Sequence, residues 1–187
     1  MEAKDLRPGK FFRMNGIIYE VVDYEFRQQP RLAASVKAKI RNIKSGAISE
    51  ENFKGNPYME DVLTEWIDMQ YSYNDGELYY FMNPETYDTV PVNKALAEGA
   101  IKFNPAEGEG IVCKFAYADG EILNVIPPTI VTLTVVDTEP SVAGDTARNA
   151  MKNATLDSGI TIKVPMFVNN GDKINVDTRT SEYKDRA

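Results

Sequence analysis

The side chain best suited to chemistry in this sequence is Arg31, which follows Pro30 in the polar, turn-prone stretch 28–31. Pro30 has no backbone N–H to donate to a sheet, so it fits the tip of a hairpin. Arg31 would then stand at the end of a protruding loop, next to the apolar Leu32. Its guanidinium is a permanent cation with five donors in a planar fork, a shape that matches phosphate or a nucleotide edge. The sequence therefore predicts a tip that contacts a phosphate or nucleotide.

The charge around Arg31 is one-sided. Six basic residues and no Asp or Glu occur from Arg27 to Lys44: Arg27, Arg31, Lys37, Lys39, Arg41 and Lys44. The whole chain carries −7, which leaves −13 for the rest. A basic hairpin on an acidic body would be oriented by a polyanion such as RNA. The alternative is a hairpin whose solvent face is merely rich in Lys and Arg.

Several kinds of catalytic and metal site are excluded. The chain has no histidine, the commonest general base and zinc ligand. Cys113 is the single cysteine, so no internal disulfide or cysteine cluster can form, and its apolar surroundings predict a buried small side chain. No spacing singles out a catalytic pair among the 28 acidic residues. We therefore expect a protein that is not an enzyme and that has no metal or cofactor.

The strands that would position Arg31 are predicted around two turns. Lys10–Met14 and Ile17–Glu25 flank Asn15-Gly16, a strong hairpin signal. Ser35–Ile43 alternates apolar and basic residues, as a half-buried strand does, and Ala47–Phe53 returns the chain. These segments predict a compact β domain at 1–64.

Two further β domains are predicted at 65–127 and 128–187. For the central one we expect a hairpin at 74–76 between tyrosine-rich strands, a poorly capped short helix at Asn93–Gly99 that stops at Gly99, and strands at Ile111–Tyr117 and Glu121–Ile126. The tyrosines fit cross-strand pairs and a small core better than a base-stacking surface. For the last domain we expect strands at 129–138, Ile160–Pro165 and Lys173–Asp177, with a long loop at Glu139–Asn153.

The chain has no apolar run long enough to span a membrane and no signal-peptide pattern at its start. With one cysteine, this predicts a cytoplasmic protein without a membrane partner.

The C-terminal third carries the most specific resemblance. The segment Lys152–Gly171, continuing through Ile174–Arg179 to Glu182-Tyr183, resembles the signature of the bacterial elongation factor P family. The stretches 135–140 and 144–147 resemble its third-domain loop, and Tyr73–Glu77 with Phe81–Asn83 resembles its second domain. The resemblance covers essentially the whole chain. It implies an all-β fold, with an SH3-like (KOW-type) barrel followed by two OB-folds in an L-shaped, tRNA-like arrangement.

The resemblance also implies a function. Such a protein, expected as a monomer, binds the 70S ribosome between the peptidyl-tRNA and exit sites, against peptidyl-tRNA and rRNA, and stimulates peptide-bond formation at consecutive prolines. Arg31, with Pro30 and Leu32, matches the tip that faces the peptidyl-tRNA. The remaining matches are the loop at the exit-site codon, Gly144, Asp145 and Thr146, and the C-terminal pair that contacts tRNA, Tyr183 and Arg186. Asp145 could instead sit in a plain turn, Tyr183 could pack on its own barrel, and Arg186 could fray with the terminus.

The tip departs from the family pattern, because stretch 28–34 lacks the glycine that usually stands beside the basic residue. A lysine-modifying enzyme has no substrate here. Arg31 is a possible site of modification by rhamnosylation, through a tip-modifying enzyme. An unmodified Arg31, as in elongation factor P-like paralogues, is the alternative that we favour.

Three alternative functions can be compared with the sequence. A paralogue with a related stalling-rescue role has the same architecture. A stand-alone OB-fold RNA-binding module would need basic barrels, yet the two later domains are acidic. A carboxylate enzyme in a cleft between domains has no supporting motif.

Overall fold

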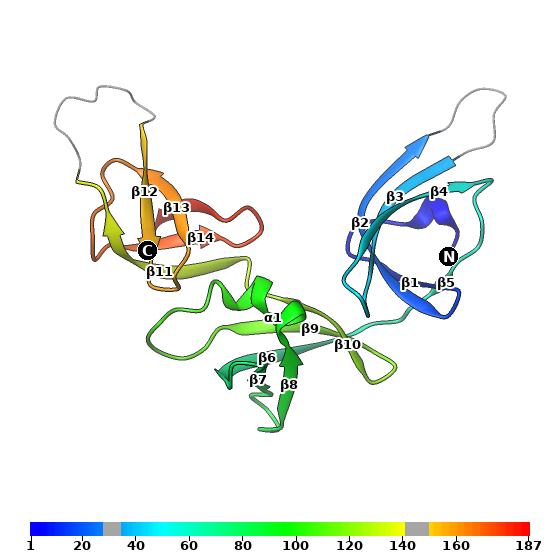
Figure 1. Cartoon of the computed structure of the whole chain (residues 1–187), viewed down its shortest axis with the longest axis horizontal. Coiled ribbons are helices and arrows are strands. Elements are labelled where there is room, and N and C mark those ends of the chain that lie inside the picture. Colours follow the sequence, from blue (N-terminus) through cyan, green and yellow to red (C-terminus); the bar gives the residue numbers. More distant parts are fainter. Residues whose placement is uncertain (28–34, 141–149) are drawn as a thin grey trace. The chain divides into compact units, whose positions relative to one another are not determined.

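The computed structural model describes residues 1–27, 35–140 and 150–187 (Figure 1). Within these residues the chain forms fifteen strands and one α-helix. The chain packs into two compact units, residues Met1–Glu65 with Tyr117–Leu123 and residues Trp66–Ala116 with Asn124–Ala187. The strands form three five-stranded sheets, which confirms the predicted all-β class. The domain boundaries at residues 64 and 127 stay predictions.

The first sheet has the strand order β4-β3-β2-β1-β5. Its strands are β1 (Phe11–Met14), β2 (Ile17–Arg27), β3 (Ser35–Asn42), β4 (Ile48–Lys54) and β5 (Glu60–Asp61), preceded by the short 3-10 helix η1 (Ala3–Asp5). Asn15 and Gly16 join β1 to β2 with φ angles of 53° and 78°. Both angles are positive, as a two-residue type I′ hairpin turn requires, and Asn and Gly adopt them most readily.

The β3 strand carries the core of the first sheet. Val36, Ala38 and Ile40 are buried, while Lys37 and Lys39 are exposed on the opposite face. This alternation confirms the predicted half-buried strand. The buried row packs with side chains from η1, its C-cap residue, β1, β2 and β4: Ala3, Leu6, Phe12, Val21 and Phe53.

The central sheet has the order β10-β9-β6-β7-β8. Its elements are β6 (Glu65–Asn74), β7 (Leu78–Met82), β8 (Thr89–Asn93), α1 (Lys94–Ile101), β9 (Val112–Ala118) and β10 (Glu121–Ile126). Strand β8 was not predicted. Pro91 stands in its middle, where a proline is tolerated because β8 lies at an edge of the sheet.

The α1 helix corrects two details of the sequence prediction. Its N-terminus is capped, since the Asn93 side chain accepts a hydrogen bond from the Leu96 N–H at 3.1 Å. Gly99 does not end the helix, which continues to Ile101. No helix in the described part of the chain is long and apolar enough to cross a membrane.

The last sheet has the order β13-β12-β11-β14-β15. Its strands are β11 (Ile130–Thr138), β12 (Met151–Leu156), β13 (Thr161–Pro165), β14 (Lys173–Asp177) and β15 (Glu182–Arg186). Two of these were missed. The expected loop Glu139–Asn153 already contains the start of β12, and residues 141–149 of that loop lie outside the described residues. The C-terminus forms β15 instead of ending in an unpaired tail.

Candidate functional site

The β2–β3 hairpin is the element on which the predicted tip depends. The two strands run side by side (Figure 1), and their pairing extends from Tyr19↔Asn42 to Arg27↔Ser35. Exposure increases toward that last pair: Val21 is buried, whereas Phe26 is 41% exposed. The tip residues Arg31, Pro30 and Leu32 fall within 28–34 and lie outside the described residues.

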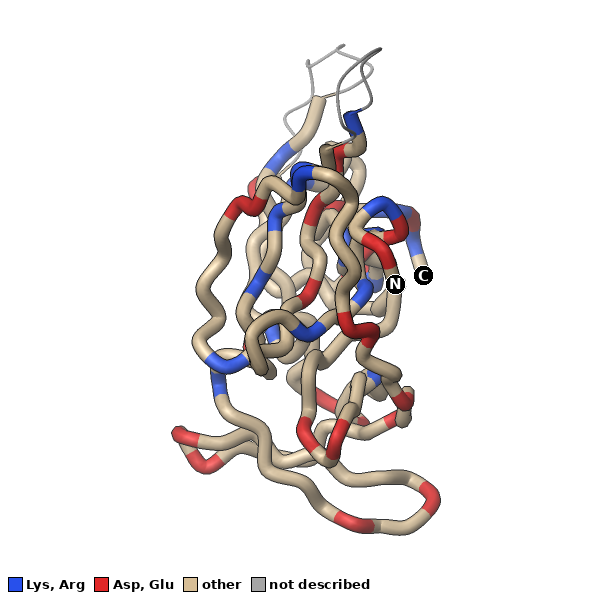
Figure 2. The backbone as a smooth tube through the Cα atoms, turned by 90° about the vertical axis from the view of Figure 1, so that its right-hand side faces the viewer, with Lys and Arg blue, Asp and Glu red and all other residues tan. Residues whose placement is uncertain are grey.

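The described strands of this hairpin carry less unbalanced positive charge than the sequence suggested. Ion pairs join three of their four cations to acidic residues of the same sheet: Arg27 to Glu25 at 2.8 Å, Lys37 to Glu50 at 2.9 Å and Arg41 to Glu20 at 3.1 Å. The Arg27 hydrogen bond lowers the pKa of Glu25. Figure 2 shows basic and acidic positions interspersed along the backbone. A count of charge from Arg27 to Lys44 missed these partners, because Glu20 and Glu25 precede that stretch on β2 and Glu50 follows it on β4.

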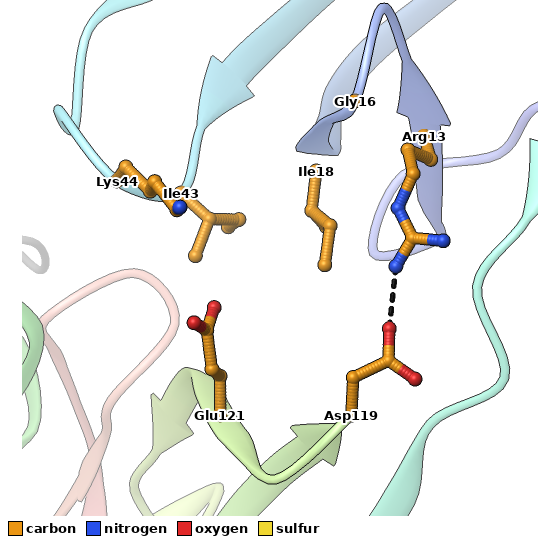
Figure 3. A pocket seen from close by; sticks show the side chains of 7 residues that line it. All are labelled: Arg13, Gly16, Ile18, Ile43, Lys44, Asp119 and Glu121. Carbon is orange, nitrogen blue, oxygen red and sulfur yellow. Dashed lines mark hydrogen bonds and ion pairs between the residues drawn. The ribbon is translucent and has the colours of Figure 1, made fainter.

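A pocket of about 200 Å³ lies beside the first sheet, within the first unit (Figure 3). The Arg13 guanidinium donates to Asp119, in the β9–β10 turn, and to Glu60 of β5. The hydrogen bond to Asp119, followed by the charge of Glu60, raises the pKa of Arg13. Ile18 and Ile43 supply an apolar wall. Lys44 and Glu121 complete the lining. Because Asp119 and Glu60 both hold the Arg13 guanidinium, we interpret the pocket as structural.

A hydrogen bond joins two residues that flank the predicted exit-site loop. Gly144, Asp145 and Thr146 lie outside the described residues. Lys152, 4% exposed, donates from Nζ to the Glu139 carbonyl at 2.6 Å. A buried ammonium needs such a partner, and this bond joins the end of β11 to the start of β12.

The predicted C-terminal pair lies on β15 and meets Phe167. The Tyr183 ring lies 6.5 Å from the Phe167 ring in an edge-to-face arrangement, and the Arg186 guanidinium lies 5.0 Å from the centre of the same ring. Arg186 Nη2 also donates to the Phe167 carbonyl at 3.2 Å and to Asp172 Oδ2 at 3.1 Å. The structure therefore brings Tyr183 and Arg186 together through a residue that sequence reasoning did not select. Arg186 is held by these contacts and does not fray.

The aromatic cluster of the central sheet forms cross-strand pairs, as predicted. Tyr73 stacks on Tyr80 at 4.5 Å, and Tyr71 meets Phe81 edge-to-face at 5.5 Å. Phe81 is fully buried, so one face of the cluster belongs to the core of the central sheet.

Reactive groups are scarce in the described part of the chain. Cys113 is fully buried, and its burial raises the pKa of the thiol to about 12, so it is a packing residue, as predicted. Among the described residues, no group of three or more acidic or cysteine side chains is arranged to hold a metal ion.

Comparison with known proteins gives matches along almost the entire chain. Three family models match: "Elongation factor P (EF-P) KOW-like domain" over residues 2–57, "Elongation factor P (EF-P) OB domain" over residues 64–125, and "Elongation factor P, C-terminal" over residues 131–186. The first two matches confirm the predicted KOW-type and OB folds.

Curated relatives agree with these models. Elongation factor P of Thermoanaerobacter sp. (strain X514) is 44% identical over 185 residues, which is 99% of this chain and 98% of the relative. The proteins of the same name from Finegoldia magna and Clostridium tetani are each 40% identical over the full length of both chains. At this identity and coverage, the chain belongs to the elongation factor P family.

Proposed function

We propose that this protein binds the ribosome between the peptidyl-tRNA and exit sites and stimulates peptide-bond formation at consecutive prolines. The observation that carries the proposal is the end-to-end match to the elongation factor P family, from residue 2 to residue 186. The proposed partners are the 70S ribosome, peptidyl-tRNA and rRNA. We further propose that the protein acts in the cytoplasm as a monomer.

The proposed mechanism is positioning without covalent chemistry. Proline is a poor nucleophile and a constrained peptidyl donor, so the reaction is slowed by geometry. A factor that holds the peptidyl-tRNA in a reactive orientation lowers the entropic part of the barrier, and the ribosome remains the catalyst. Such a factor needs cations and hydrogen-bond donors placed against tRNA, and it needs no nucleophile or general base.

Arg31 is the proposed contact to the peptidyl-tRNA. The β2–β3 hairpin supports it from strands that are paired up to Arg27 and Ser35. Pro30 restricts the backbone before Arg31, and Leu32 adds an apolar neighbour after it. At the other end of the chain, Gly144–Thr146 would contact the exit-site codon, and Tyr183 with Arg186 would contact tRNA.

The distribution of charge separates this proposal from a stand-alone OB-fold RNA-binding module. Residues 65–127 contain eleven acidic and three basic residues, and Figure 2 shows acidic positions prevailing on the loops of the central sheet. An acidic OB barrel repels a phosphate backbone, so it cannot serve alone as a general RNA-binding surface. A paralogue with a related rescue role stays the alternative, because stretch 28–34 lacks glycine.

A reconstituted translation reaction tests the function. On a template that encodes three consecutive prolines, the protein should accelerate synthesis, and an unchanged rate would refute the proposal. Arg31→Ala should abolish the acceleration while changing the free energy of unfolding by less than ~0.5 kcal/mol, because the proposed contact to tRNA requires a solvent-accessible side chain and substitutions at such positions rarely affect folding. Lys37→Gln is the matched control: it also removes a hairpin cation, but one already paired with Glu50, so the acceleration should persist.

The state of Arg31 has a separate test. Intact-mass measurement of protein from its native cells distinguishes an unmodified chain from one that carries a deoxyhexose. We propose the unmodified side chain, and a mass increase removed by Arg31→Lys would refute this.

A further inference from the structure

The pairing between β11 and β12 stops short of the start of β12. Its last pair is Thr138↔Ala154. Residues 151–153 of β12 lie beyond that pair and pair with β13 instead. Within the described residues, backbone pairing therefore does not join β11 to the first residues of β12, and other contacts must hold the two strand ends together.

Two side chains bridge the strand ends, and they do so in opposite directions. The Thr138 hydroxyl of β11 donates to the Asn153 carbonyl of β12 at 2.7 Å. The Lys152 ammonium of β12 donates at 2.6 Å to the carbonyl of Glu139, the residue that follows β11. We call these two bonds the loop clasp. Each bond joins a side chain on one side of the loop at 141–149 to the backbone on the other side, so the clasp holds both ends of the loop.

The position of Lys152 is unusual for a cation. The residue is 4% exposed, and toward the described residues its ammonium has no carboxylate partner. Arg179, between β14 and β15, shows the usual arrangement, because its Nε and Nη2 bind the Asp177 carboxylate at the surface, at 3.0 and 2.6 Å. Burying an ammonium without a counter-ion costs free energy that an apolar side chain of the same length would not. Packing alone would therefore favour an apolar residue at this position, and the bond to the Glu139 carbonyl is what the charge adds.

Pro140 adds a constraint at the entrance to the loop. Proline biases the residue before it toward extended backbone, which favours a Glu139 that continues the direction of β11. Residues 141–149 themselves lie outside the described residues. The described residues on either side nevertheless restrict how the chain enters the loop, at Glu139, and how it leaves, at Asn153.

We propose that Lys152 is a positioning residue for the loop at 141–149, which the proposed function places against the exit-site codon. The proposal rests on that function and adds to it a residue that is too deeply buried to contact RNA itself. A loop whose two ends are held has fewer conformations, so it loses less entropy when it binds. The competing role is that Lys152 only stabilises the last barrel.

The test uses the full-length protein and 70S ribosomes that carry a peptidyl-prolyl-tRNA before a proline codon. The concentration that gives half-maximal acceleration and the maximal rate are measured at several salt concentrations. Lys152→Met keeps a long side chain that can stay buried, but it removes the donor to Glu139. The half-maximal concentration should rise about tenfold at an unchanged maximal rate, because the loop must then be ordered on binding. The melting temperature should not fall, since an apolar side chain avoids the cost of burying a charge.

The salt dependence and two further variants show how Lys152 acts. A buried ammonium neutralises no phosphate, so Lys152→Met should leave the slope of log affinity against log salt unchanged. Thr138→Val removes the other donor of the loop clasp and should also weaken binding at an unchanged slope. Lys163→Met is the matched control. Lys163 is exposed on β13 and makes no hydrogen bond or ion pair with the described residues, so the half-maximal concentration should stay near the wild-type value.

A double-mutant cycle tests whether Lys152 acts through the loop. Asp145→Ala removes a side chain that the proposed function places at the exit-site codon. If Lys152 positions the loop, Lys152→Met should weaken binding much less in the Asp145→Ala protein than in the wild-type protein. An independent structural effect would be equal in both backgrounds and would refute the positioning role.

The outcomes separate the two proposals. A wild-type half-maximal concentration in Lys152→Met would refute the positioning role and leave the proposed function standing. Equal weakening by Lys163→Met and Lys152→Met would show a general charge effect and would also refute the positioning role. If the wild-type protein neither binds the ribosome nor accelerates the reaction, the proposed function fails and the positioning role fails with it.

Discussion

Gly110 is the position at which the structure predicts the sharpest cost of a single methyl group. A Cβ added there would lie 2.0 Å from the Tyr71 carbonyl oxygen and 2.8 Å from its carbon. Carbon makes favourable contacts at about 3.5 Å, so the backbone on either side must separate by ~1 Å or more. This shift would break the bond from Tyr71 N–H to the Ile111 carbonyl, now 2.9 Å, and the bond from the Gln70 side chain to the Gly110 carbonyl, now 3.3 Å.

The expected magnitude follows from these terms. Overpacking costs about 1–3 kcal/mol and each of the two lost hydrogen bonds about 1 kcal/mol, so Gly110→Ala should destabilise the protein by about 3–5 kcal/mol. Urea unfolding followed by the fluorescence of Trp66, the single tryptophan, measures this, because Trp66 lies on β6 together with Tyr71.

Gly99→Ala is the matched control for Gly110→Ala. A Cβ at Gly99 meets no atom within 4 Å, and the residue lies inside α1, where alanine is favoured over glycine by about 0.5–1 kcal/mol. The two variants should therefore move the urea midpoint in opposite directions. A Gly110→Ala protein with wild-type stability would refute the close approach of residue 110 to β6.

Three further predictions concern groups described above. Cys113 should resist thiol reagents in the native protein at pH 8, where a thiol of pKa about 12 holds ~2000-fold less thiolate than a free cysteine, and should react on unfolding; rapid native labelling would contradict its burial. Asn93→Ala should cost about 1 kcal/mol in urea unfolding, because the Leu96 N–H loses its cap, and Asn93→Asp should restore most of it. The pKa of Asp177, lowered to about 2 mainly by the Arg179 hydrogen bond, should rise toward 3.8 in Arg179→Gln by NMR titration. Because this pKa is lower in the folded state, the stabilisation it gives is present above the unfolded value and is lost as the pH falls from about 4 to about 2.

Local signals in the sequence predicted the strands well where side chains alternate or turns are distinctive. Asn15-Gly16 needs two positive φ angles and has them, and β3 alternates because one face meets the core. The missed strands lack these signals. In β12 a charged residue, Lys152, takes one of the buried positions, so the strand does not show the usual alternation of apolar and polar residues. Strand β15 has four charged residues around Tyr183, and it pairs with β14 chiefly through backbone hydrogen bonds.

Only part of the candidate site could be predicted from the sequence, for a related reason. Tyr183 and Arg186 were identified by the family resemblance. Phe167 contacts them only in the folded protein, where the loop before β14 packs against β15. A sequence places Phe167 sixteen residues from Tyr183, with no periodicity that connects them. Contacts of this kind depend on tertiary structure, and sequence pattern cannot supply them.

The ion pairs of the first sheet change the role that charge has in the proposed function. If the strand cations of the β2–β3 hairpin acted together on RNA, several phosphates would be neutralised and affinity would fall steeply with salt. Because Lys37 and Arg41 already face Glu50 and Glu20, their approach to RNA would first require these acids to be displaced. The proposed contact to the peptidyl-tRNA therefore rests on Arg31 and on its placement by the hairpin, and the described strands of the hairpin act as a nearly neutral support. A basic surface predicts similar losses of acceleration from Arg31→Ala and Lys37→Gln, whereas a single positioned contact predicts a loss from Arg31→Ala alone.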